Sequence, residues 1–103
     1  MLNQVVLVGK VKELPVTKET TNGIKVATMV VEVERGFRNA NGVLESDDFL
    51  VTLWRGIAEE CQSSCHVGSL VGLKGRLQAN NYNKEDSIYY KADIIAEKVS
   101  FLN

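Results

Sequence analysis

Cysteine, proline and histidine are scarce in this sequence, and long apolar runs are missing. The 103 residues include two cysteines, one proline and one histidine. No apolar run approaches the ~20 residues that a membrane helix needs, and the N-terminus lacks the basic and apolar segments of a secretory signal. Two cysteines in a chain long enough to bury a core favour reduced thiols over a disulfide scaffold. We therefore expect a cytoplasmic protein with no membrane partner.

Residues that could carry catalysis or hold a metal are also few. Cys61 and Cys65 share a helical face next to His66, but a zinc site usually needs four ligands, and the sequence offers no second pair. We interpret the cysteines as buried helix residues and His66 as a surface residue. No glycine-rich phosphate loop, carboxylate pair or nucleophile–base arrangement stands out, and Gly72 and Gly75 suit strand curvature or close approach in a barrel. The sequence predicts no enzyme, no metal and no cofactor.

Charge of one sign is not in excess either. The chain carries 12 Lys and Arg against 13 Asp and Glu, which gives a formal net charge of -1. Attraction of nucleic acid by an overall positive charge is therefore excluded. A local basic stripe can still bind phosphates, because salt screens charges that are more than about 10 Å apart.

Two stretches alternate with the period of a β-strand. In residues 47–55, Val51 and Leu53 fall on one face, while the opposite face presents Trp54, the only tryptophan. Residues 68–78 alternate in the same way, and their outer face is cationic. An aromatic surface beside a cationic strand suits a flexible polyanion with flat bases. This pairing is the first indication of a binding function.

Turn signals divide the rest of the chain into strands and one helix. Asn-Gly pairs mark tight hairpin turns, and proline interrupts a strand ladder. The expected strands are residues 2–9, with a weak continuation over 10–14 up to Pro15, and residues 24–35, 49–55, 68–78 and 88–102; hairpin loops are expected at 20–23, 37–42 and 80–87, and a helix at 57–64.

Three strands, a short helix and two more strands follow the element order of an OB-fold, whose open face and loops hold oligonucleotides or oligosaccharides. An SH3-like barrel or a small sandwich would more often lack the helix. We therefore predict an all-β protein with an OB-fold, a five-stranded Greek-key barrel with one short helix between strands 3 and 4. A chain of this length fits one domain, so we assign residues 1–103 to a single OB-fold domain.

The chain also resembles a known family along nearly its whole length. The segments MLNQVVLVGKV, NGIKVATMVVEVERGFRN, FLVTLWRGIAE and VGSLVGLKGRLQ followed by NNY resemble a bacterial or phage single-stranded DNA-binding protein. The resemblance implies an OB-fold that assembles into a homotetramer, wraps single-stranded DNA over basic and aromatic surfaces, and has no catalytic activity.

The resemblance assigns the base-stacking aromatics of the family to Phe37, Trp54 and Tyr82. For Trp54 alone, ordinary core packing is the alternative. Phe49 is the nearest candidate for a fourth aromatic, but it precedes Trp54 by five residues, whereas the family pattern has six. An odd separation places the two rings on opposite faces unless a bulge intervenes. In that case Asp48 occupies the position of the aromatic, and Phe49 belongs to the core or to a subunit contact.

Cationic side chains lie next to these aromatics in the sequence or on the same strand face. They can neutralise phosphates or stack as guanidinium planes, although a solvated sheet face is the alternative for some of them. Nearby carboxylates are expected to weaken the attraction of phosphates. The cations are Arg35, Arg38, Arg55, Lys74 and Arg76, and the carboxylates are Glu32, Glu34, Asp47 and Asp48.

The function that follows is sequence-independent binding and protection of single-stranded DNA in replication, recombination or repair, in association with the nucleoid. The family usually carries a flexible tail with an acidic tip that recruits replication proteins. This sequence ends at the last expected strand, so we expect no recruitment of such partners unless a tail has been removed. The alternative is a dimeric OB-fold module of the primosomal type that binds DNA and replication proteins, and the mass of the oligomer distinguishes the two.

Overall fold

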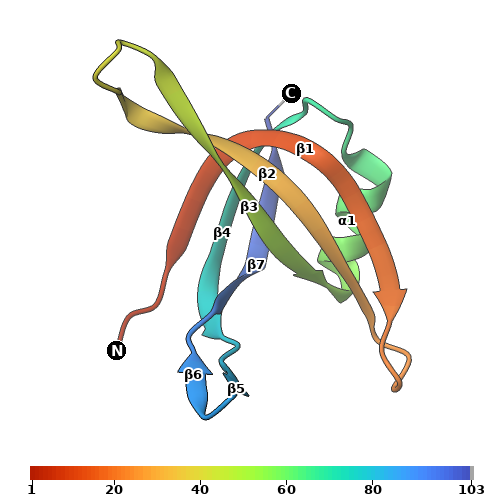
Figure 1. Ribbon diagram of the computed structural model, residues 1–103. Coiled ribbons are helices and arrows are strands. Elements are labelled where there is room, and N and C mark those ends of the chain that lie inside the picture. Colours follow the sequence, from red (N-terminus) through yellow and green to blue (C-terminus); the bar gives the residue numbers. More distant parts are fainter. Residues whose placement is uncertain (103) are drawn as a thin grey trace.

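A computed structural model describes residues 1–102 of the chain (Figure 1). Five long strands form a closed barrel in the order β1-β2-β3-β7-β4, in which β4 pairs with β1 to complete the circle. Among the strand pairs of residues 1–102, only β3–β7 is parallel. The elements are β1 (Val5–Glu19), β2 (Lys25–Arg38), β3 (Leu44–Trp54), α1 (Arg55–Ser64), β4 (Leu70–Ala79), β5 (Tyr82–Lys84), β6 (Ser87–Tyr89) and β7 (Ala92–Phe101). This confirms the predicted OB-fold with one helix between the third and fourth strands.

The core is built from the strand alternation that the sequence predicts. Val51 and Leu53 are fully buried, and across the ladder they face Met29 and Ala27 of β2, which are also buried. The helix α1 lies against the barrel and contributes Ala58 and Cys61 to the same core. Because one face of β3 is occupied by this packing, its other face is left for solvent or a ligand.

The first strand continues past Pro15, where we predicted an interruption. Glu13 pairs with Val30 and Val16 pairs with Thr28, so three steps along β1 oppose two steps along β2. This β-bulge takes Pro15, which has no backbone N–H to donate, out of the regular ladder. The proline therefore bends β1 without ending it.

The last part of the chain differs most from the prediction. The expected strand at residues 88–102 is divided, because Ser87–Tyr89 pairs with Tyr82–Lys84 in a separate two-stranded hairpin, and β7 begins only at Ala92. Glu85 and Asp86 both have positive φ angles, of 51° and 64°, which is the backbone of a tight two-residue turn. The expected polar loop at residues 80–87 is thus most of a β-hairpin that projects from the barrel (Figure 1).

A bulge in β7 breaks the expected alternation in that strand. Lys98 pairs with Lys74 and Ala96 pairs with Gly75, so one residue of β7 is left over between them. At this point a Cβ on Gly75 would lie 2.0 Å from the carbonyl oxygen of Ile95. Gly75 therefore fulfils the expectation of close approach in the barrel.

Helix α1 begins two residues earlier than expected, directly after Trp54. Arg55 has a φ angle of 54°, in the left-handed region, and this residue turns the chain from β3 into the helix. Gly56 thus lies in the first turn of α1. Among residues 1–102, no helix is long and apolar enough to cross a membrane.

Candidate nucleic-acid interface

Trp54 is exposed at the end of β3. It points away from the core residues Val51 and Leu53, and it faces Val26 across the β2–β3 ladder. The side chain is 39% exposed, so part of the indole packs on the sheet and part is open. An indole held in this way can accept an unpaired base on its open face.

Phe37 and Tyr82 lie on two arms of the barrel. Phe37 is 67% exposed near the end of β2, inside the strand rather than in the expected loop, where the pairing between Glu34 and Arg38 is irregular. Tyr82 is 51% exposed in the β5–β6 hairpin. Figure 1 shows the β2–β3 tip and the β5–β6 hairpin projecting in different directions. The three aromatics are therefore spread over the surface and do not form one pocket, an arrangement that suits a long flexible polymer.

Phe49 lies on the opposite face of β3 from Trp54. The β2–β3 pairing runs without a register shift from Val26 opposite Trp54 to Glu34 opposite Ser46, so no bulge intervenes. The side chain of Phe49 is half-buried on the face that carries the core residues. Asp48 occupies the outer face instead, as the odd separation requires.

The outer face of the β2–β3 ladder changes character along its length. Near Trp54 it is apolar, with Val30 paired with Leu50. Further along it is acidic, with Glu32 paired with Asp48. A nucleobase is therefore better accommodated at the Trp54 end, because carboxylates repel the phosphates that follow each base.

Lys12 partly neutralises this acidic end. Its Nζ lies 2.7 Å from Oδ2 of Asp48 and 4.0 Å from Oε2 of Glu32. The hydrogen bond to Asp48, together with the negative charges around it, holds the pKa of Lys12 above its ordinary value. Lys12 was not among the predicted site residues, because its partners lie on strands distant in the sequence.

Arg35 is engaged by carboxylates of the neighbouring strand. Its Nε donates to Oδ2 of Asp47 at 3.0 Å, its Nη2 to Oδ1 of Asp47 at 2.9 Å, and its Nη1 to Oε2 of Glu45 at 2.6 Å. The hydrogen bond and charge of the guanidinium hold the pKa of the Asp47 carboxyl below its ordinary value. A phosphate must compete with these partners to reach Arg35.

The other four cations differ in how they are engaged. Arg38 donates from Nη1 to the carbonyl oxygen of Gly42 at 3.0 Å. Arg76 donates to Oε1 of Gln78 at 2.8 Å, and its Nε lies 3.8 Å from Oε2 of Glu97. Arg55 and Lys74 form no ion pair within the part of the chain that the structure describes. Of the predicted cations, a phosphate can therefore reach Arg55 and Lys74 without displacing any of these partners, and Arg38 by displacing only a backbone carbonyl.

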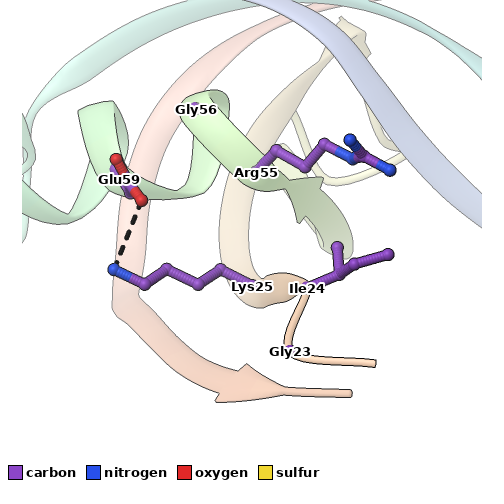
Figure 2. Close-up of a pocket in the computed structure, with 6 residues that line it drawn as sticks. All are labelled: Gly23, Ile24, Lys25, Arg55, Gly56 and Glu59. Carbon is purple, nitrogen blue, oxygen red and sulfur yellow. Dashed lines mark ion pairs between the residues drawn. The ribbon is translucent and has the colours of Figure 1, made fainter. Parts of the chain in front are cut away.

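Arg55 lines a shallow surface pocket of about 370 Å³ that also includes Gly23, Ile24, Lys25, Gly56 and Glu59. Nζ of Lys25 lies 3.2 Å from Oε1 of Glu59. Figure 2 shows the Arg55 side chain extending away from this ion pair, in the same direction as Ile24. Arg55 is the residue after Trp54, so a cationic side chain and an exposed indole are adjacent in the chain.

The two cysteines are buried, as predicted. Cys61 lies in α1, and Cys65 follows the helix as its C-terminal cap rather than inside it. Burial, together with the neighbouring Cys65, raises the pKa of Cys61 to about 12. His66 is exposed. Over residues 1–102, no three His, Cys, Asp or Glu side chains are grouped in a way that could hold a metal ion.

Tyr89 and Tyr90 are exposed aromatics that the sequence analysis placed in the last strand of the barrel. The structure places Tyr89 in β6, where its ring stacks on that of Tyr82, and leaves Tyr90 just outside the hairpin. The signal that could have identified them is the pair Glu85-Asp86 between two short segments that each contain an aromatic. Acidic residues tolerate a left-handed turn less readily than Asn-Gly, so this signal is weak.

The comparisons with known proteins identify a family for this chain. A profile described as "Single-strand binding protein family" matches residues 2–102. Single-stranded DNA-binding protein B of Bacillus subtilis (strain 168) is 39% identical over 104 residues, which cover 100% of this chain and 92% of that protein. The single-stranded DNA-binding proteins of Bacillus cereus and Lactiplantibacillus plantarum are 40% and 37% identical over 99% of this chain. The chain spans only 61% and 52% of the length of these two relatives.

A solved structure shows the same fold. The crystal structure of a small single-stranded DNA-binding protein from Streptomyces coelicolor matches with a TM-score of 0.73 and 24% sequence identity. The match covers 98% of this chain and 95% of the other. The fold is therefore shared by proteins of low sequence identity.

Proposed function

Because the chain belongs to the single-strand binding protein family, we propose that it coats single-stranded DNA through stacked bases and phosphate contacts. Proteins of this family bind DNA and are not enzymes. The bases stack on Trp54, Phe37 and Tyr82, and the binding has little sequence preference because every base has a flat aromatic face. By coating unpaired strands, the protein takes part in DNA replication, recombination or repair, and it acts in the cytoplasm in association with the nucleoid.

The observation that carries this proposal is the position of Trp54. Core residues of β3 fill the opposite face of the strand, so the indole lies at the sheet surface with part of its ring open. Stacking of one base on such a ring contributes about 1 to 3 kcal/mol. Three exposed rings on one chain then give substantial affinity, which rises further when several chains assemble.

Phosphate contacts come first from Arg55 and Lys74, which have no competing ion pair in the described part of the chain. Arg38 and Arg76 can also bind phosphate, but each must first break a hydrogen bond to a neutral oxygen of the protein. Arg35 must break its ion pairs with Asp47 and Glu45 before it can bind phosphate. Phe49 is not part of the stacking set, because it lies on the core side of β3.

The phosphate contacts make binding sensitive to salt. We expect the affinity for DNA to fall as the salt concentration rises, because each neutralised phosphate releases a counterion.

We propose that the protein forms a homo-oligomer through an apolar patch on the outer face of β1. Val6 and Val8 are exposed there, and Val8 lies beside Gly72 and Leu102. Gly72 adds no side chain to this patch, and exposed apolar patches mark protein contacts. A homotetramer is the expected state.

The alternative function is that of a primosomal-type module that binds DNA and replication proteins. A dimer, measured by native mass spectrometry, would favour this alternative.

Fluorescence titration with oligo-dT tests the proposed function. Trp54 is the only tryptophan, so a base that stacks on it quenches the emission directly. We expect Trp54→Ala to weaken binding by roughly tenfold and Trp54→Phe to retain most of it, because an aromatic face is preserved. For Trp54→Ala and Trp54→Phe, which lack tryptophan emission, binding is followed by the anisotropy of a labelled oligonucleotide. Unquenched emission together with an unchanged affinity of Trp54→Ala would show that the stacking mechanism is wrong.

A further inference from the structure

Tyr82 and Tyr89 form a stacked pair on the β5–β6 hairpin. They are direct cross-strand partners, and their ring centroids lie 5.2 Å apart with an angle of 11° between the planes. Offset stacks of this kind stabilise a pair by about 0.5 to 1.5 kcal/mol beyond the area they bury. The two phenols therefore hold one another in place.

Both tyrosines of the pair are about half exposed to solvent. Tyr82 is 51% exposed and Tyr89 is 45% exposed, as expected when each ring covers one face of the other and leaves its second face free. All of residues 80–92 are exposed, so this hairpin contributes nothing to the barrel core. Two ordered aromatic rings without a packing role form a surface that is suited to binding another flat ring.

The base of the hairpin is fixed by backbone contacts. The N–H of Asn80 donates to the carbonyl oxygen of Lys91 at 2.7 Å, and the N–H of Lys91 donates to Oδ1 of Asn81 at 3.1 Å. The tight turn at Glu85 and Asp86 closes the other end. A platform that is ordered before binding loses less conformational entropy when a ligand binds.

We propose that Tyr89 is a base-stacking residue, and that Tyr82 and Tyr89 act as one preformed platform that takes an unpaired nucleobase on the outer face of each ring. This inference rests on the proposed function, since the ligand is the same single-stranded DNA. It assigns to the hairpin two base positions in place of the one that Tyr82 alone provides. It also gives Tyr89 a second role, because loss of its ring frees Tyr82 to rotate.

Tyr90 provides a matched control. It is the next residue in the chain and is 81% exposed, yet it lies outside β6 and is not part of the stacked pair. A general contribution of exposed tyrosines to DNA binding would involve Tyr90 at least as much as Tyr89. The platform involves Tyr89 and excludes Tyr90.

The test compares Tyr89→Ala, Tyr89→Phe and Tyr90→Ala by titration with labelled oligo-dT. We expect Tyr89→Ala to weaken binding by about fivefold or more, which corresponds to one lost stacking position. Tyr89→Phe, which keeps the ring, and Tyr90→Ala should both bind as the parent does. Thermal unfolding of Tyr89→Phe and Tyr90→Ala should be unchanged, and that of Tyr89→Ala should be lowered only slightly, because the hairpin lies outside the core and only the stack with Tyr82 is lost. The proposal is overturned if Tyr89→Ala binds as tightly as the parent, or if Tyr90→Ala loses as much affinity.

Photo-cross-linking gives a second, direct readout on the parent protein. An oligonucleotide that carries 5-iodo-deoxyuridine is irradiated in complex with the protein, and the cross-linked peptide is mapped by mass spectrometry. Adducts on both Tyr82 and Tyr89 support the platform. Adducts on Tyr90 without any on Tyr89 contradict it.

The same titrations separate this inference from the proposed function. If the parent protein does not bind oligo-dT, the proposed function fails. If the parent binds and Trp54→Ala weakens binding while Tyr89→Ala does not, the proposed function stands and only the platform fails.

Discussion

Arg35 and Asp47 form a two-pronged ion pair across the β2–β3 ladder, with N···O distances of 3.0 and 2.9 Å. Glu45 adds a third hydrogen bond to the same guanidinium. One of the predicted phosphate ligands is thus held by the protein's own carboxylates. DNA binding at this arm depends on whether a phosphate can displace them.

Neutralising both carboxylates should release Arg35. We expect the double variant Glu45→Gln, Asp47→Asn to bind oligo-dT more tightly at low salt, and the slope of log K against log salt to steepen by about 0.7, the value for one added phosphate contact on a single strand. Titrations at several salt concentrations measure both quantities. The double variant Glu19→Gln, Glu60→Gln, which removes two exposed carboxylates away from Arg35, serves as the control for the same change of net charge. An unchanged slope would mean that Arg35 does not bind phosphate.

Replacing Asp48 by tryptophan should add a stacking position. Asp48 lies on the same face of β3 as Trp54, with no register shift between them, and its carboxylate is paired with Lys12. We expect Asp48→Trp to tighten binding to oligo-dT by about fivefold or more. Asp48→Asn removes the charge without adding a ring, so the difference in affinity between the two variants isolates stacking. Equal affinities would show that DNA does not pass over this part of the sheet.

Arg55 should show opposite effects on stability and on DNA binding. A non-glycine residue in the left-handed region costs about 1 to 2 kcal/mol, and Arg55 has a φ angle of 54°. We therefore expect Arg55→Gly to raise the free energy of unfolding by about 1 kcal/mol while weakening DNA binding. Arg55→Ala should weaken binding to the same extent without the gain in stability. Urea unfolding and DNA titration of both variants are the measurements, and equal stabilities would contradict the prediction.

The buried thiol of Cys61 should make the protein less stable at alkaline pH. Its pKa rises from the ordinary 9.0 to about 12 in the folded state. Above pH 9 the unfolded chain releases a proton that the folded chain retains, so the stabilisation present below pH 9 is lost as the pH rises towards 12. Urea unfolding between neutral pH and pH 10 should show this loss, and a Cys61→Ala variant should show a smaller one. A thiol reagent should label Cys61 only after unfolding, and rapid labelling of the folded protein would contradict its burial.

The sequence by itself determined the barrel and which faces of its strands the aromatic side chains occupy. Alternation along β3 separated Val51 and Leu53 from Trp54, because side chains of a strand point to opposite faces in turn. The same rule placed Phe49 on the face opposite Trp54 once no bulge intervened. The exposure of Phe37 and Tyr82 followed from the polar segments around them. Local periodicity is sufficient for these features, since each depends on a few neighbouring residues.

The tertiary structure alone decided which cations are free and which aromatics meet. Arg35 reaches Asp47 because of the register of the β2–β3 hairpin, and Lys12 reaches Asp48 across strands that are distant in the sequence. Tyr89 lies in the β5–β6 hairpin and not in β7, and it stacks on Tyr82 because a tight turn forms this hairpin before β7 begins. Pairing, bulges and register are set by contacts between strands, and the pattern within a single strand carries no record of the residue across from it.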